Sequence, residues 1–97
     1  MHHNYETKQK YNQSKSNIQV KVAQLEQAVN NERSLRIYYK SPAKPLTVND
    51  IRPFKIVHVT DMDRYYLISI DCDMITLYRV DRIKRYEFCK KKLIFQI

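Results

Sequence analysis

Residues 76–88 read "TLYRVDRIKRYEF", and apolar and basic side chains alternate in this stretch up to Val80 and then stop alternating. A period of two is typical of a strand with one buried face. Asp81 is suited to cap a single helical turn through residues 82–84, which would direct Ile83 into the core. The stretch therefore predicts a strand, a helical turn and a second strand in place of one long strand.

Strand patterns also occur elsewhere in the chain, as alternating segments or as short runs rich in β-branched and aromatic residues. We expect strands at about residues 34–40, 54–60, 64–71 and 74–80, and a fifth at 84–91. The sequence contains no Gly, although tight turns usually use Gly at positions with positive φ. We therefore expect Asn and Asp to occupy those positions.

An amphipathic helix precedes the strands. Between residues 18 and 29, apolar side chains recur at helical spacing and polar side chains fill the other face. Ser16 or Asn17 is suited to cap the start of this helix, and Asn30 and Asn31 tolerate the left-handed conformation at its end. One helix followed by five short antiparallel strands predicts an α+β fold, mostly β. We expect the helix to pack on a small, half-open, five-stranded barrel.

The chain has room for one small domain, because it contains 97 residues, of which 43% are hydrophobic. Residues 1–16 are polar and basic, and we interpret them as a mobile arm. We expect the domain at residues 17–92, followed by an apolar tail at residues 93–97. The tail, with Leu93, Ile94, Phe95 and Ile97, either docks onto a partner or forms the last strand of the domain itself.

The chain is strongly basic, with 18 Lys and Arg residues against 10 Asp and Glu residues and a formal net charge of +8. This charge favours association with polyanions, although it also serves solubility alone. Cys72 and Cys89 have no Cys or His companions at metal-ligand spacing, which predicts two buried, reduced thiols. The sequence shows neither a membrane-spanning apolar run nor a signal peptide, so we expect a cytoplasmic protein that does not bind membranes.

We find no set of residues typical of catalysis, and we expect no enzyme activity, no cofactor and no bound metal. His58 lies in an apolar strand, where a structural role is favoured over that of a general base. Asp61, Asp63, Asp71 and Asp73 bracket predicted turns, where Asp forms local hydrogen bonds with the backbone. A chain without Gly has no Gly-rich phosphate-binding loop, which excludes a P-loop or Rossmann-type site.

A basic and aromatic surface remains as the candidate site. Aromatic rings stack on unpaired bases and cations contact phosphates, so the combination suits single-stranded nucleic acid. The alternative is that the aromatic residues are ordinary strand and core residues. The candidate ligand-binding residues on this basis are Arg36, Tyr78, Arg79, Arg82, Lys84 and Arg85.

Three motifs give the chain a resemblance to a known family. "IRPFKI" at residues 51–56 carries Pro53 in a strand, "RYYLISID" at residues 64–71 matches the family's naming motif, and "LYRVDRI" at residues 77–83 matches its closing motif. With the opening segment "LEQAVNNERSLRIYY", these motifs make residues 25–88 resemble the WYL domain. That family has an Sm-like or SH3-like barrel and occurs in bacterial and phage regulators and defence systems.

The resemblance implies a ligand-sensing module that holds nucleic acid, often single-stranded DNA, by arginines and aromatic residues on the barrel. It assigns the two closing arginines of the family to Arg79 and Arg82, and aromatic positions to Tyr66 and Tyr78. Only some 24 residues precede Leu25. We therefore expect no separate DNA-reading domain, and a protein that works alone, as a homo-oligomer or with a larger protein partner.

The sequence thus predicts a small, non-catalytic accessory or regulatory protein that binds nucleic acid, with single-stranded DNA favoured. Two alternatives stay open. One is an interaction subunit of a larger enzyme of replication, repair or defence. The other is a sensor of a small anionic ligand.

Overall fold

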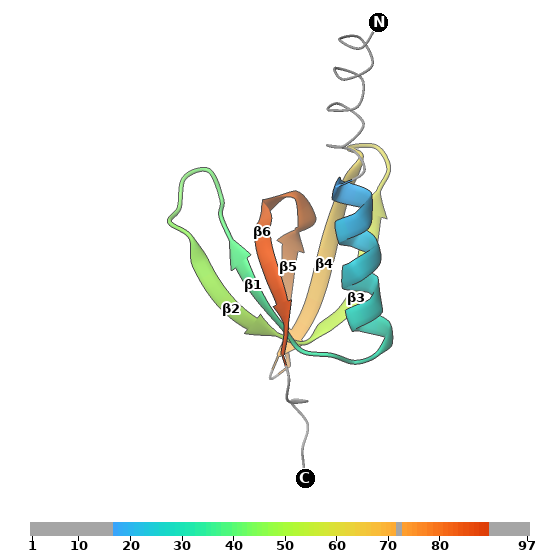
Figure 1. The fold of residues 1–97 in the computed structure, drawn as a ribbon. Helices are drawn as coiled ribbons and strands as arrows, with labels where there is room; N and C mark the ends of the chain where they lie inside the picture. The colour runs from blue at the N-terminus through green and yellow to red at the C-terminus, as the bar shows by residue number, and fades with distance from the viewer. Residues whose placement is uncertain (1–16, 72, 90–97) are drawn as a thin grey trace, which may run out of the picture.

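The computed structural model of the protein describes residues 17–71 and 73–89 (Figure 1). This part of the chain contains a helix over residues 17–30, six strands and a single 3₁₀ turn. The strands are β1 (Leu35–Tyr39), β2 (Thr47–Ile51), β3 (Pro53–Val59), β4 (Arg64–Asp71), β5 (Met74–Arg79) and β6 (Ile83–Phe88), and the 3₁₀ turn is η1 (Val80–Arg82). The expected basic arm and apolar tail lie outside the described residues.

The strands form two antiparallel sheets of three strands each, in the orders β2-β1-β6 and β3-β4-β5. The α+β class, mostly β, is confirmed. The expected barrel of five strands is wrong in its strand number, and the two sheets do not close into a continuous barrel within the described residues. The helix lies across one side of the sheets, as Figure 1 shows.

The strand that the sequence pattern missed is β2. Its five residues pair fully with β1, from Leu35 opposite Ile51 to Tyr39 opposite Thr47. Only Ile51 of β2 is buried, so the strand has no alternation of apolar and polar residues to reveal it. The chain passes from the first sheet to the second at Arg52, whose carbonyl oxygen accepts a hydrogen bond from the amide of Ile70 at 3.3 Å. Pro53 then opens β3, a position where a strand tolerates a residue without a donor.

The core lies between the helix and the inner faces of both sheets. Its fully buried apolar residues come from the helix, from four of the strands and from η1, and they are Leu25, Ala28, Leu35, Ile37, Ile51, Leu67, Val80 and Ile83. The predicted inward position of Ile83 is confirmed. No helix in the described part of the chain is long and apolar enough to cross a membrane.

The helical turn after β5 begins two residues earlier than predicted. It covers Val80–Arg82, and Ile83 already belongs to β6. Asp81 does not cap this turn, because its carboxylate is bound by the side chain of Arg79. The cap position is Arg79, which has extended backbone angles and provides no side-chain cap.

The helix ends in a Schellman motif. The amide of Arg33 donates to the carbonyl oxygen of Ala28 at 2.8 Å, and the amide of Glu32 donates to that of Val29 at 3.2 Å. Glu32 takes the left-handed position, with φ of 53°, in place of the Asn residues that the sequence favoured. The prediction for the hairpin turns is confirmed at Asp63 and Asp73, whose φ values are 48° and 69°.

Candidate anion-binding site

Three arginines gather around the carboxylate of Asp81, and we call Arg64, Arg79 and Arg82 the arginine cluster. They come from the start of β4, the end of β5 and η1, and β4 packs beside η1. The hydrogen bonds from Arg79 lower the pKa of Asp81, and the nearby charges of all three arginines act in the same direction. Asp81 therefore pairs directly with Arg79 and lies within range of the charges of Arg64 and Arg82, and the cluster keeps an excess of positive charge.

Arg79 is the most firmly held member of the arginine cluster. Its Nε lies 3.0 Å from Oδ1 of Asp81 and its Nη2 lies 2.7 Å from Oδ2, which is a bidentate pair. Its backbone amide donates to the hydroxyl of Tyr39 at 3.0 Å, and its side chain is 22% exposed. The pair with Asp81 raises the pKa of Arg79. This arginine is therefore both fixed in position and largely neutralised.

Arg64 and Arg82 are less constrained. Arg64 donates from Nη1 to the hydroxyl of Tyr66 at 3.3 Å. The backbone carbonyl of Arg82 accepts a hydrogen bond from the amide of Lys40 at 3.0 Å. Within residues 17–71 and 73–89, neither guanidinium forms an ion pair with a carboxylate closer than 4.0 Å. These two arginines can therefore receive an anionic ligand without first giving up a close partner.

Tyr66 lies directly beside the arginine cluster. It is opposite Arg79 in the pairing of β4 with β5, so both side chains are on the outer face of that sheet. Its hydroxyl receives the hydrogen bond from Arg64. Its half-buried ring therefore lies beside Arg64 and Arg79.

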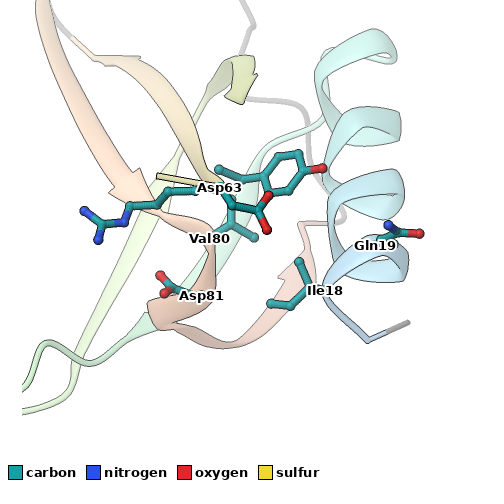
Figure 2. Close-up of a pocket in the computed structure, with 7 residues that line it drawn as sticks. Ile18, Gln19, Asp63, Val80 and Asp81 are labelled. Atoms are coloured by element: carbon teal, nitrogen blue, oxygen red, sulfur yellow. The ribbon is translucent and has the colours of Figure 1, made fainter. Parts of the chain in front are cut away.

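A pocket of about 350 Å³ lies next to the arginine cluster, between the helix and the start of β4. Figure 2 shows Ile18 of the helix on one side of this pocket and Val80 and Asp81 on the other. Its lining residues are Ile18, Gln19, Asp63, Arg64, Tyr65, Val80 and Asp81. The pocket thus combines apolar side chains with one cation and two carboxylates.

Lys21 of the helix forms hydrogen bonds with the backbone at both ends of η1. Its Nζ donates to the carbonyl oxygen of Ile83 at 2.8 Å and to that of Val80 at 3.4 Å. Burial lowers the pKa of Lys21, and the charge of Lys84 acts in the same direction. The ammonium group thus satisfies two carbonyl groups at the ends of the turn that carries Asp81 and Arg82.

The structure places two other predicted cations on a different surface. Arg36 forms a bidentate pair with Asp50, with Nε to Oδ1 at 2.7 Å and Nη2 to Oδ2 at 3.1 Å, and this pair lowers the pKa of Asp50. Arg85 is bound to Glu87 and lies over the ring of Tyr38, 4.6 Å from its centre. Both belong to the β2-β1-β6 sheet, apart from the arginine cluster.

The other two candidates differ from each other in burial. Lys84 is exposed at the start of β6, and its charge acts on Lys21. Tyr78 is turned toward the core, where its ring meets that of Tyr39 edge to face at 5.2 Å. Burial raises the pKa of Tyr78. Its ring therefore packs as a core residue and not on the face that carries Tyr66.

Sequence reasoning missed Arg64 as a member of the site. The residue opens the "RYYLISID" strand directly after the Asp63 turn, so its position was visible, but its proximity to Asp81 depends on how β4 packs on η1. Leu93, Ile94, Phe95 and Ile97 lie outside the described residues, as does Cys72, whereas Cys89 is a half-buried free thiol.

His58 is bound within its own hairpin. Its Nε2 is 2.9 Å from Oδ1 of Asp63, and its ring stacks on Tyr65 at 4.2 Å. Both contacts lie within the β3-β4 hairpin. In the described part of the chain, His, Cys, Asp and Glu side chains form no group of three or more that is placed to hold a metal ion.

The chain belongs to the WYL domain family, because the family model "WYL domain" matches residues 20–88. Among solved structures, it is similar to proteasome accessory factor B/C (PafBC) of Arthrobacter aurescens, with a TM-score of 0.67 and 20% sequence identity. The similarity covers 78% of this chain but 12% of that chain, and at this identity it concerns the fold alone. No curated protein matches the sequence.

Proposed function

We propose that this WYL domain protein is a non-catalytic accessory or regulatory protein that binds nucleic acid, with single-stranded DNA as the favoured ligand. The observation that carries the proposal is the arginine cluster, in which Arg79 binds the carboxylate of Asp81 and the charges of Arg64 and Arg82 also act on it. Phosphate groups are bound by guanidinium groups through charge-assisted hydrogen bonds, often in bidentate form. Arg64 and Arg82 can form such bonds with a phosphate, because neither is paired with a carboxylate of the described residues.

Tyr66 supports a single-stranded ligand over a duplex. Unpaired bases stack on aromatic rings, and each such contact contributes about 1–3 kcal/mol. The ring of Tyr66 stands beside Arg79 on the outer face of the β3-β4-β5 sheet. A strand whose phosphate meets Arg64 can therefore place a base on Tyr66, whereas the bases of a duplex are not available for stacking.

The formal net charge of +8 supports the same proposal. A basic surface raises the local concentration of a polyanion and releases its bound counterions on contact. Most of the binding free energy then depends on salt, and sequence preference is weak. We therefore expect binding that responds to ionic strength much more than to base composition.

A small anionic ligand is the second candidate, and the pocket beside Arg64 favours it. Its volume of about 350 Å³ lies at the lower end of the range for small-molecule sites. The carboxylates of Asp63 and Asp81 also line the pocket and would repel a highly charged anion. A ligand with one negative group and an apolar body would suit this lining.

Titration of fluorescently labelled oligothymidine, followed by anisotropy at about 50 and 200 mM salt, tests the proposal. We expect micromolar binding at the lower salt concentration and a loss of affinity of at least tenfold at the higher one. Labelled duplex DNA of the same length serves as the comparison and should bind more weakly. Absence of binding at low salt would contradict the proposal.

A further inference from the structure

The edge of β5 lacks the features that usually protect a sheet edge. Within the described sheets the edge strands are β2, β6, β3 and β5. Proteins guard such edges with charged residues, Pro or bulges, because an open row of backbone groups accepts another strand. The other three edges carry such protective features. These are Asp50 in β2, Pro53, Lys55 and a bulge in β3, and Lys84, Arg85 and Glu87 in β6.

From Met74 to Tyr78, β5 contains neither a charged residue nor Pro, and its pairing with β4 is regular throughout. Two apolar side chains of this segment point outward, with Ile75 64% and Leu77 55% exposed. They are opposite Ile70 and Ile68 of β4, which extend the same apolar face. The edge is therefore uncharged, regular and apolar on its outer face.

One hydrogen bond shows which backbone groups face this edge. The amide of Arg79 donates to the hydroxyl of Tyr39 in β1, so it points away from β4. Backbone groups alternate in direction along a strand, so the amide and carbonyl groups of Ile75 and Leu77 also point away from β4. The usable edge ends at Arg79, whose amide is taken, and at Asp73, where φ is positive. Its midpoint is Thr76.

We propose that β5 pairs with β5 of a second copy of this chain, antiparallel and centred on Thr76. Opposite residues in an antiparallel ladder share a face, so Ile75 meets Leu77 of the second copy on the outer face. Both residues direct their backbone groups to the edge, so they form the hydrogen-bonded pairs. Thr76 meets its own counterpart at the two-fold axis, in the closer, non-hydrogen-bonded position.

The charges at the two ends of β5 favour this register. Centring on Thr76 brings Asp73 of the second copy to the end of β5 that carries the arginine cluster, whose excess of positive charge remains after Arg79 pairs with Asp81. The two-fold symmetry repeats this at the other end. Centring on Leu77 would instead place Arg79 opposite Ile75. The arrangement is closed, because each copy uses its β5 edge once, so it predicts a dimer and no longer assembly.

Sedimentation equilibrium over a concentration series tests the proposal. A ladder of about five residues is short, so we expect a dimer that dissociates on dilution and is populated at about 0.1–1 mM protein. Leu77→Lys should raise the dissociation constant about tenfold or more, since it puts a cation in the apolar row. The matched control is Val48→Lys, because Val48 is 52% exposed and lies on the β2 edge. Circular dichroism shows whether each variant folds.

A cysteine at the two-fold axis tests the register independently. In a background with Cys72→Ser and Cys89→Ser, Thr76→Cys should form an intermolecular disulfide under mild oxidation. The Cα atoms of a non-hydrogen-bonded pair are about 4.5 Å apart, which a disulfide spans. Val48→Cys in the same background should remain uncrosslinked.

Three outcomes would overturn the proposal. The first is a monomer at every concentration. The second is a dimer unaffected by Leu77→Lys in which Thr76→Cys does not crosslink. The third is a monomer that dimerises once residues 93–97 are removed, which would mean that the tail of the same chain covers β5.

Discussion

Asp81 determines how the arginine cluster is arranged. Its carboxylate fixes Arg79 by two hydrogen bonds, and the charges of Arg64 and Arg82 also act on it. A single acidic residue thus offsets part of the positive charge of three arginines. Asp81 pairs with Arg79 alone, so among the described residues the guanidinium groups of Arg64 and Arg82 have no carboxylate within 4.0 Å.

Protonation of Asp81 should therefore be visible in stability. The hydrogen bonds from Arg79 lower the pKa of Asp81 in the folded protein. The stabilisation from the ionised Asp81 carboxylate is complete above the ordinary pKa of Asp, about 3.9. It is lost as the pH falls through the lower pKa that Asp81 has in the folded protein. We expect Asp81→Asn to melt at a lower temperature than the natural sequence at pH 6, and the difference to shrink toward about pH 2. A difference that is constant over this pH range would contradict the account.

At the residue scale, the sequence identified Arg79 and Arg82 but could not show their unequal roles. Arg79 is paired with Asp81, and no carboxylate of the described residues pairs with Arg82 at close range. The difference follows from side-chain geometry at η1, which no spacing rule encodes. Arg36 was equally visible as a cation, and its pairing with Asp50 depends on β2, a strand that the pattern missed.

At the scale of single elements, the helix holds η1 in place through the side chain of Lys21. Lys21 donates hydrogen bonds to the carbonyl groups of Val80 and Ile83, which flank the residues of the site. Removing one partner of a partly buried hydrogen bond leaves the other unsatisfied, at a cost of about 1–3 kcal/mol. The helix therefore holds η1, with Asp81 and Arg82, as well as covering the core.

Substitution of Lys21 by Met tests this role. We expect the melting temperature to fall by roughly 5–15 °C, since 1 kcal/mol corresponds to about 4–8 °C in a domain of this size. Lys44→Met is the matched control, because Lys44 is exposed in the connection between β1 and β2. Equal melting temperatures for the two variants would show that the hydrogen bonds of Lys21 contribute nothing.

The end of the helix offers a stabilising substitution. Glu32 has a φ of 53°, a conformation that costs a residue with a side chain about 1–2 kcal/mol, whereas Gly adopts it freely. After the entropy cost of Gly, we expect Glu32→Gly to stabilise the protein by about 0.5 kcal/mol, measured by urea unfolding. The same substitution at Glu26, inside the helix, should destabilise it by about 1 kcal/mol. Equal losses at both positions would contradict the Schellman assignment.

Sequence patterns predicted those elements whose residues alternate or recur regularly. The helix and the strands β1, β3, β4, β5 and β6 were all expected within a few residues of their observed positions. The strand β2 was missed because four of its five residues are not buried, so hydrophobic period carries no signal there. The position of η1 was displaced because Asp81 pairs with Arg79 and not with the backbone of the turn.

At the scale of the whole molecule, the fold brings separate parts of the sequence to one end. Figure 1 shows η1 at the end of the sheets opposite to the turn between β4 and β5. The arginine cluster therefore lies at one end of β5, and the Asp73 turn lies at the other. In the proposed dimer, the two arginine clusters would lie at the far ends of the paired strands, each still accessible to a ligand.

The arrangement of the sheets was only partly predictable. Family motifs and strand order indicated a small β domain covered by a helix, and both features are present. The division into two sheets depends on the turn of the chain at Arg52 and Pro53, between β2 and β3. A Pro in a strand pattern signals an irregularity, but it does not show that the chain changes sheets there.

The most direct test of the proposed function compares the salt dependence of single-stranded DNA binding in three proteins. These are the natural sequence, Arg82→Ala in the arginine cluster, and Arg52→Ala, which removes an exposed arginine between β2 and β3. If Arg82 contacts a phosphate, its loss should weaken binding about tenfold and reduce the slope of log K against log salt by about 0.7. Arg52→Ala should leave the affinity and the slope close to those of the natural sequence. Equal effects of the two substitutions would contradict the assignment of the arginine cluster as the nucleic-acid site.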